Sequence, residues 1–384
     1  MRRGAAVGVL AAVLGLPLAA DVRVMRAVRP LDGKWQHMRV ASRRSTLLGI
    51  SFRPPQVDDL GLDARAALTR LLAYPFQLIR LGAYWKRVEP SPGRFEPDEL
   101  DWQIDAAERA GKQIIVCVGA LKTFGYPEFF VPAHHLPRPL QEGSLVGPTS
   151  HPALLEAGCA FIERIVERYR DRAAIVAWQV EHESVDPLGL EHSWRLTTSF
   201  VQTEIATVRR VDAGRPILLN GFLPTSILGG VQQWWATRDQ GDSLAAAVRF
   251  ADILGLDVYP RLALLSVGPM TAYLDGSRGR WPKRVREQLV ARALAAGRRV
   301  MVSEGQAEPW ETVTTPPDPR DGAMASCTPE RLIENYNTCL QWPGLGAAGL
   351  YAYLFWGAEY WLKRAQGGDE SYLGAFARVL EHSA

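Results

Sequence analysis

Two glutamates that follow apolar runs are the residues of this sequence best suited to acid–base chemistry. The run Ala174–Val180 is long enough for one buried strand, and it turns abruptly polar at His182 and Glu183. A second short run, Arg299–Ser303, ends directly before Glu304. Two carboxyl groups facing each other across a pocket suit cleavage of an acetal bond, because one can deliver a proton while the other attacks carbon. A core strand that ends in a solvated acidic turn is the alternative interpretation of the first stretch.

These glutamates need a scaffold, and the pattern of the chain from Thr46 onward predicts one. Short apolar runs alternate with amphipathic stretches, which is typical of strand–helix units. The expected strands are 47–52, 76–82, 113–119, 174–180, 216–220, 252–258, 299–303 and 345–354. The expected helices are 57–73, 97–111, 152–170, 193–211, 244–250, 283–296, 329–340 and 369–381. Eight such units predict an α/β fold, a closed (β/α)8 TIM barrel, with a doubly wound open sheet as the alternative.

In a barrel, the residues just past the carboxyl ends of the strands meet around one axis. If the acetal bond to be cleaved joins two sugars, the site must also bind sugar rings. Aromatic side chains stack on the apolar faces of such rings, while polar groups bind their hydroxyls. We therefore expect the tryptophans at 85, 310 and 356 to act as sugar-binding platforms. Asp257 is either a sugar ligand or a strand-end charge. The set of supporting residues expected around the two glutamates is Arg80, Trp85, His182, Asp257, Tyr259, Trp310 and Trp356.

Several neighbouring residues have other expected places. Trp178 lies inside an apolar run and is expected in the core, and Glu181 is expected to point into the barrel wall or a salt bridge. Trp361, Glu128 and Tyr126 are candidates for loops around the pocket.

The quoted positions resemble those of glycoside hydrolase clan A, whose barrels include cellulases, mannanases and thermophilic-type β-galactosidases. The fragments that carry the resemblance are Ile79–Gly82 with Trp85–Phe95, Trp178–Glu183, Asp252–Pro260 and Val302–Gly305. The resemblance implies a retaining glycoside hydrolase in which Glu183 is the acid/base and Glu304 is the nucleophile. It also implies that Arg80 keeps Glu304 ionised and that Tyr259 donates a hydrogen bond to the same carboxylate.

The chain departs from this pattern at His182, where the clan usually has Asn. Some mannanase-type members also carry His there, so the substitution indicates a mannose-like or otherwise unusual substrate. The expected partner is an oligo- or polysaccharide with a β-linkage. Two alternatives remain open: a carbohydrate-binding barrel without turnover, and a transglycosylase that acts on a surface polysaccharide.

Composition excludes other classes of partner. The formal net charge is only +3 and Lys and Arg are spread along the chain, so we do not expect nucleic acid. The segment Gly344–Gly349 has the spacing of a dinucleotide-binding loop but follows a helix and precedes a strand, so no cofactor is expected.

No metal site is expected either, and His134 and His135 are interpreted as a solvated loop pair. Among the four cysteines, Cys327 and Cys339 could form a disulfide.

The N-terminus is expected to be separate from the barrel. Residues 1–20 combine a short basic start with an apolar run of small residues, which predicts a signal peptide or a membrane anchor through residues 4–20. Residues 21–45 are then a linker or N-terminal extension, and 46–384 form the catalytic domain. The protein is expected to be secreted or extracytoplasmic, and its oligomeric state is left open.

Overall fold

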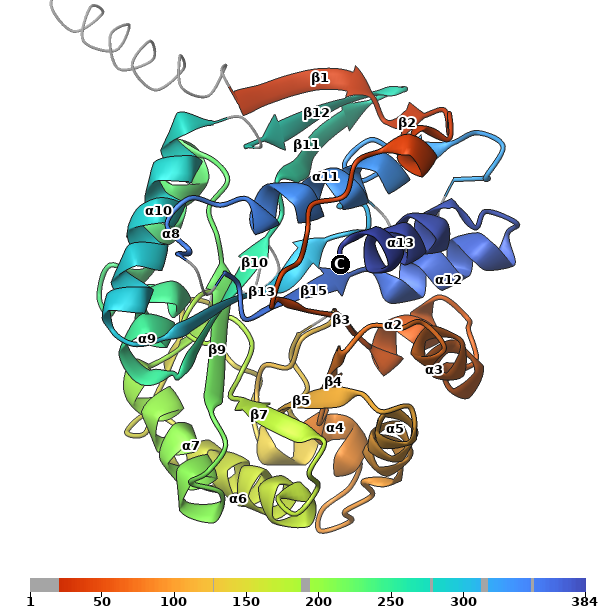
Figure 1. Cartoon of the computed structure of the whole chain (residues 1–384). Coiled ribbons are helices and arrows are strands. Elements are labelled where there is room, and N and C mark those ends of the chain that lie inside the picture. The colour runs from red at the N-terminus through yellow and green to blue at the C-terminus, as the bar shows by residue number, and fades with distance from the viewer. Residues whose placement is uncertain (1–20, 127, 188–193, 277–278, 312–316, 347–348) are drawn as a thin grey trace, which may run out of the picture.

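Eight parallel strands close into a barrel, which confirms the TIM-barrel prediction and rules out the open sheet. A computed structural model describes residues 21–126, 128–187, 194–276, 279–311, 317–346 and 349–384. The barrel strands are β3 (Leu47–Ser51), β4 (Leu78–Gly82), β5 (Gln113–Cys117), β7 (Ile175–Gln179), β9 (Ile217–Phe222), β10 (Ile253–Val258), β13 (Arg299–Gln306) and β15 (Ala352–Trp356). Figure 1 shows the helices arranged around the outside of these strands.

The helices cover the barrel with their apolar faces, as amphipathic crossovers must. They are α2 (Pro54–Asp59), α3 (Ala64–Leu72), α5 (Asp98–Arg109), α6 (Pro152–Tyr169), α7 (Thr198–Val211), α9 (Ser243–Phe250), α10 (Arg280–Ala295), α11 (Pro329–Leu340) and α13 (Ser371–His382). Side-chain caps fix where some begin: the hydroxyl of Thr197 accepts from the Phe200 amide at the start of α7, and that of Thr328 accepts from Arg331 at the start of α11.

The first predicted helix and the last predicted strand differ from the observed elements. Residues 57–73 form two helices rather than one, because Gly61 has a positive φ of 64° and the side chain of Asp63 caps a new helix. The eighth strand begins at Ala352 rather than 345. Gly346 and Gly349 have φ values of 64° and 66°, which extended strands do not adopt.

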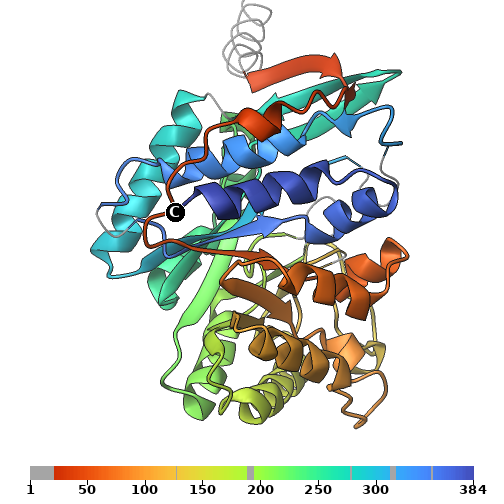
Figure 2. The same ribbon diagram turned by 45° about the vertical axis from the view of Figure 1, so that its right-hand side comes forward.

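Insertions after the strands add elements that the sequence pattern did not predict. They are α8 (Ile227–Thr237), α12 (Ala358–Gln366) and the hairpin of β11 (Arg261–Val267) and β12 (Met270–Asp275). The hairpin pairs with β1 (Val22–Arg26), so the start of the N-terminal extension is part of a three-stranded sheet against the barrel (Figure 2). The remaining short elements are β2 (Val28–Arg29), η1 (Lys34–His37), α4 (Trp85–Val88), η2 (Ala133–His135), β6 (Leu145–Val146), β8 (Arg195–Leu196) and β14 (Ala323–Met324).

Two expectations concern regions away from the barrel axis. The predicted signal peptide or anchor at 1–20 lies outside the described residues. Across the residues that are described, no helix has both the length and the apolar character needed to cross a membrane. Cys327 and Cys339 are separate buried thiols in the structure, so the disulfide considered for them is not formed. The Cys327 thiol instead lies 3.7 Å from the carbonyl oxygen of Gln306.

The barrel interior explains why the site must lie at one end. Small and branched side chains from the strands fill the axis as a buried layer. Its members are Leu78, Ile115, Ala177, Leu218, Ile253, Met301, Ala352 and Leu354. Further along the strands, towards their carboxyl ends, a second buried cluster contains Phe124, Tyr259 and Trp356. The polar groups of the site therefore lie past the first of these layers, at the carboxyl face, where they contact the second cluster.

Candidate active site

Glu304 lies near the carboxyl end of β13, where the neighbouring strand β10 and the more distant strand β4 supply its hydrogen-bond donors. Arg80 on β4 donates from Nη2 to Oε1 at 2.6 Å, and Tyr259 after β10 donates its hydroxyl to Oε2 at 2.5 Å. Ser51 and Gln179 accept from the other nitrogens of the same guanidinium, at 2.9 Å and 3.3 Å. Both oxygens of Glu304 are thus fixed, and the carboxylate is only 2% exposed.

Glu183 comes from a loop rather than a strand, and its backbone is held by two contacts. Its φ is 44°, a conformation that costs energy for a residue with a side chain. Lys122 donates from Nζ to its carbonyl oxygen at 2.5 Å, and its amide donates to Oδ1 of Asn220 at 3.3 Å. The side chain is half-buried. These contacts hold a strained backbone that presents the carboxyl group next to His182.

The two carboxyl groups differ in their proton affinity. Burial raises the pKa of Glu183 well above its usual range, and the negative charges of Asp257, Glu128, Asp186 and Glu304 raise it further. Burial also raises the pKa of Glu304, but there the charge of Arg80 and the hydrogen bonds from Tyr259 and Arg80 counteract it. The arrangement therefore favours a proton on Glu183 and a negative charge on Glu304.

His182 joins the surroundings of the two glutamates. Its Nδ1 lies 2.9 Å from Nδ2 of Asn220 and 3.6 Å from Oε1 of Glu304. A carboxylate oxygen of Glu183 lies within 4.8 Å of a ring nitrogen of His182. Burial, together with the charges of Arg80 and Lys122, lowers the pKa of His182 well below its usual range, so the ring is neutral at neutral pH.

Asn220, at the end region of β9, connects this part of the site. Its Nδ2 donates to Asp257 at 2.6 Å as well as to His182, while its Oδ1 accepts from Gln179 at 3.0 Å. Since Nδ1 of His182 accepts this hydrogen bond, the ring proton lies on Nε2, which faces Glu128 at 3.9 Å. The network thus fixes one tautomer of His182.

Asp257 belongs to this network rather than to the open surface. Its side chain is fully buried, and Ser303 donates to its Oδ1 at 2.7 Å. Of the two interpretations for Asp257, its burial and its hydrogen bonds favour a strand-end group over a direct sugar ligand.

The tryptophans expected as platforms lie in different environments. Trp356 ends β15 at the floor of the site, where it is 8% exposed and the guanidinium of Arg53 covers its ring at 4.1 Å. Arg53 is itself held by two buried carboxylates, Glu308 and Glu359. Trp310 is 45% exposed and its ring meets that of Tyr259 edge-on at 5.4 Å. Trp310 is therefore accessible to a ligand next to the Glu304 carboxylate.

The expectation for Trp85 is wrong. Its ring is fully buried against Phe161 and His135, at ring-centroid distances of 5.4 Å and 4.5 Å. The residue begins the short helix α4 after β4, and this turn directs its side chain into the layer between barrel and helices. Trp361 is likewise buried in α12 and donates to the Ala307 carbonyl, so it is not a loop residue at the pocket.

Two other expectations hold. Trp178 is fully buried, and its indole donates to Asp212. Glu181 is buried and accepts from the amides of Leu121 and Lys122, so it fastens the loop that follows β5. Gly119 must lack a side chain here, because a Cβ would lie 2.1 Å from the Glu181 amide nitrogen.

Sequence reasoning missed Asn220, Lys122 and the Arg53 cluster. Asn220 had a usable signal, because it is the polar residue that ends an expected strand. Arg53 had the same signal, one position past the first expected strand. Lys122 had none, since its role depends on how the loop after β5 folds back on Glu183.

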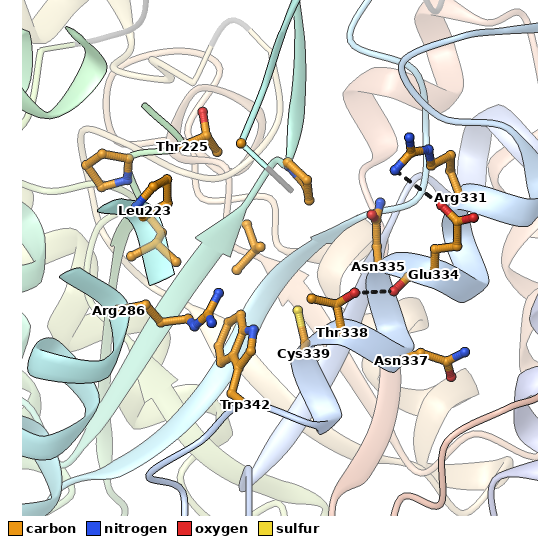
Figure 3. A pocket seen from close by; sticks show the side chains of 15 residues that line it. Leu223, Thr225, Arg286, Arg331, Glu334, Asn335, Asn337, Thr338, Cys339 and Trp342 are labelled. Atoms are coloured by element: carbon orange, nitrogen blue, oxygen red, sulfur yellow. Dashed lines mark hydrogen bonds and ion pairs between the residues drawn. The ribbon is translucent and has the colours of Figure 1, made fainter. Parts of the chain in front are cut away.

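A cavity of about 390 Å3 lies outside the barrel and does not contain the two glutamates. It lies between α10 and α11, beside the ends of β9 and β10 (Figure 3). Arg286 lines it with its guanidinium over the ring of Trp342 at 4.6 Å. The cavity is therefore separate from the candidate active site.

Comparisons with known proteins show similarity to glycoside hydrolases. A family model described as beta-galactosidase, of glycoside hydrolase family 42, matches residues 54–202. Among solved structures, a GH5_18 protein from Streptomyces cattleya in complex with GlcNAc is 15% identical, with a TM-score of 0.55 and coverage of 90% of this chain and 82% of that chain. A search of curated proteins gave no match.

Two further structures have the same fold. A GH5_18 variant from Streptomyces cattleya in complex with Manb1-4GlcNAc is 16% identical, with a TM-score of 0.53 and coverage of 81% and 71% of the two chains. Xylanase 10B from Thermotoga maritima is 12% identical, with a TM-score of 0.52 and coverage of 89% and 98%. By the family match over residues 54–202 and the closed barrel that it shares with these structures, the chain is similar to the TIM-barrel glycosidases of glycoside hydrolase clan A.

Proposed function

We propose that the protein is a retaining glycoside hydrolase with Glu304 as nucleophile and Glu183 as acid/base. The observation that carries the proposal is the contrast between the two carboxyl groups. Arg80 and Tyr259 hold Glu304 in one orientation and favour its charge, whereas Glu183 lies among other carboxylates that favour its proton. This is the division of roles that a double displacement requires.

The residues would act in two steps. Glu304 attacks the anomeric carbon while Glu183 gives its proton to the leaving oxygen, so a glycosyl ester forms on Glu304 and the aglycone departs. Glu183, now ionised, then takes a proton from water, and this water breaks the ester. Arg80 and Tyr259 stay next to the Glu304 carboxyl group. They stabilise its negative charge again when the sugar is released.

We further propose a β-linked substrate with a mannose-like unit at the reacting position. The support is His182, which is neutral and offers its Nε2–H towards the space between Glu128 and Glu183. A ring N–H there can donate to a sugar hydroxyl next to the anomeric carbon. The similar Streptomyces cattleya protein crystallised with Manb1-4GlcNAc makes this class of sugar the first to test.

Covalent trapping tests the mechanism. A 2-deoxy-2-fluoro mannosyl fluoride should inactivate the wild type, and peptide mass spectrometry should locate the added sugar on Glu304. Label on another residue would contradict the proposal. A protein that binds the sugar without any label or turnover would support the alternative of a binding barrel. Product analysis with an added acceptor sugar separates hydrolysis from transglycosylation.

We also propose that the protein is exported, with residues 4–20 acting as a signal peptide or a membrane tether. The support is the composition of this run, which directly precedes β1. Expression of the full chain, followed by fractionation and mass measurement, tests this: a mature form beginning near Asp21 indicates cleavage, and a full-length form in the membrane fraction indicates a tether. Full-length protein in the cytoplasm would contradict both.

A further inference from the structure

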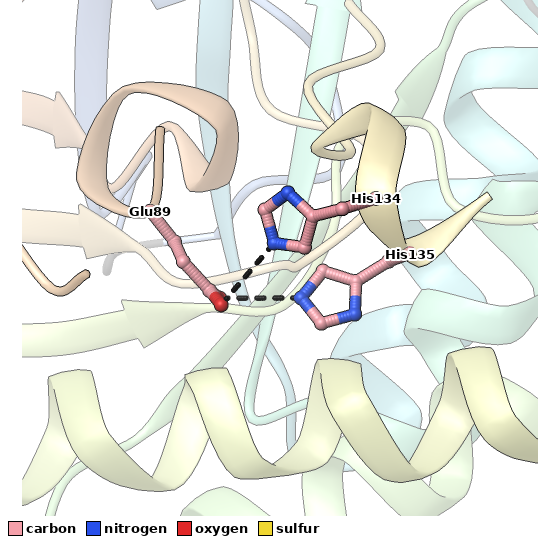
Figure 4. Close-up of side chains that lie close together, drawn as sticks. All are labelled: Glu89, His134 and His135. Atoms are coloured by element: carbon pink, nitrogen blue, oxygen red, sulfur yellow. Dashed lines mark hydrogen bonds and ion pairs between the residues drawn. The ribbon is translucent and has the colours of Figure 1, made fainter. Parts of the chain in front are cut away.

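Glu89, His134 and His135 form a cluster of side chains outside the catalytic machinery. Glu89 directly follows α4, and the two histidines lie next to each other on η2, in the loop between β5 and α6. Figure 4 shows both rings turned towards the Glu89 carboxylate. Nε2 of His134 is 3.3 Å from Oε1, and Nε2 of His135 is 3.3 Å from Oε2.

These distances suit metal ligands better than direct hydrogen bonds. A charge-assisted N–H···O bond is usually about 2.7–2.9 Å long. Ligand atoms about 2.05 Å from a tetrahedral zinc ion are about 3.3 Å apart, since a tetrahedral edge is about 1.63 times the bond length. One nitrogen from each of His134 and His135, together with a carboxylate oxygen of Glu89, lie within 4.8 Å of one another. The three side chains are thus close enough to offer one ligand atom each to a single ion.

The surrounding structure holds these ligands in place. Trp85 donates from its indole nitrogen to Glu89 at 2.8 Å, and the Gly93 amide donates to the other oxygen at 3.3 Å. The ring of His135 lies against the ring of Trp85, with centroids 4.5 Å apart. The Glu89 carboxylate is therefore oriented by two donors, with both imidazole rings close to its oxygens.

We propose that Glu89, His134 and His135 bind one divalent transition-metal ion, of which Zn2+ fits best, with water as the fourth ligand. Imidazole nitrogens with a single carboxylate are a ligand set that zinc prefers. Two other groups of potential ligands share His182, where the positive charges of Arg80 and Lys122 disfavour a cation. The cluster at Glu89 is half-buried, so an ion can reach it.

The metal would fasten one wall of the active site. The loop that carries His134 and His135 also carries Lys122, which holds the Glu183 backbone, and Glu128, which faces His182. Glu89 belongs to the segment after β4, the strand that carries Arg80. A metal bridging the two segments would reduce their relative motion without touching the substrate.

Zinc titration of the full-length protein tests the proposal. After treatment with a chelator, calorimetry with Zn2+ should show one site per chain, and Zn2+ should raise the melting temperature. Replacing both histidines (His134→Ala with His135→Ala) should weaken binding by more than about 100-fold, because two of three ligands are lost. The matched control His37→Ala removes an exposed histidine of η1 and should bind Zn2+ like the wild type.

Two further measurements keep the result interpretable. Circular dichroism should show that the double variant is folded, and if it is not, His134→Gln alone replaces it, with weaker zinc binding expected. The proposal is overturned if the wild type binds no more Zn2+ than the double variant, or if His37→Ala weakens binding as much. In either case the three residues are a hydrogen-bonded cluster with adventitious ion binding only.

Discussion

Glu304 and Glu183 are chemically identical groups in opposite surroundings. Glu304 lies on the barrel strand β13, and its two oxygens are fixed by Arg80 and Tyr259. Glu183 lies on a strained loop that Lys122 holds through the backbone, and the charges of several carboxylates raise the pKa of its side chain. The comparison suggests how one barrel can favour the charge of one carboxyl group and the proton of the other: it restrains the side chain of Glu304 but the backbone of Glu183.

Removing Glu304 should have the largest effect. Glu304→Ala should lower kcat/KM by at least about 10^4-fold for every substrate, because no ester can form. Glu183→Ala should cost about 10^2–10^4-fold for substrates with poor leaving groups and much less for activated aryl glycosides, which need no proton. Steady-state kinetics with a series of aryl glycosides measures both. Equal leaving-group dependence in the two variants would show that the roles are not divided in this way.

Arg80 provides a test through pH. The proposed mechanism requires ionised Glu304 and protonated Glu183, so activity should be lost at low pH as Glu304 takes up a proton and at high pH as Glu183 loses one. In Arg80→Gln the acidic limb of kcat/KM should move up by about one to three pH units, because a nearby positive charge is gone. Arg80→Lys should restore part of the shift. An unchanged acidic limb would mean that Arg80 is structural only.

The smallest expected effect is on stability. The pKa of Glu183 is higher in the folded protein than in the unfolded chain. The folded state therefore loses stability as the pH rises from the unfolded-state pKa to the folded-state pKa, because folding then requires an ionised carboxyl group in a site that disfavours the charge. Glu183→Gln should therefore raise the free energy of unfolding by about 1 kcal/mol at pH 8 and leave it unchanged at pH 4. Thermal melts at both pH values measure this, with Glu181→Gln as the comparison variant. A loss of stability at pH 8 would contradict the assigned environment.

The sequence predicted the parts of the site that depend on strand position. Glu304, Tyr259 and Arg80 lie at or near the ends of buried strands, and a closed barrel brings strand ends together whatever the loops do. Asn220 was within reach of the same rule but was overlooked.

The sequence could not predict parts that depend on loop conformation. Trp85 follows a strand end, yet a single helical turn directs it into the core. The approach of His134 and His135 to Glu89 joins residues 45 and 46 positions apart through a loop without periodicity. No pattern of residue types fixes such a contact, because loop conformation depends on individual anchoring hydrogen bonds.

Azide rescue is the most direct test of the central claim that Glu304 is the nucleophile and Glu183 the acid/base. With an activated aryl β-glycoside, Glu304→Ala supplied with azide should yield the α-glycosyl azide, because azide attacks the substrate directly. Glu183→Ala with azide should yield the β-glycosyl azide, because azide attacks the ester on Glu304. Nuclear magnetic resonance of the products distinguishes the two anomers. A β-azide from Glu304→Ala, or wild-type activity in that variant without azide, would contradict the account.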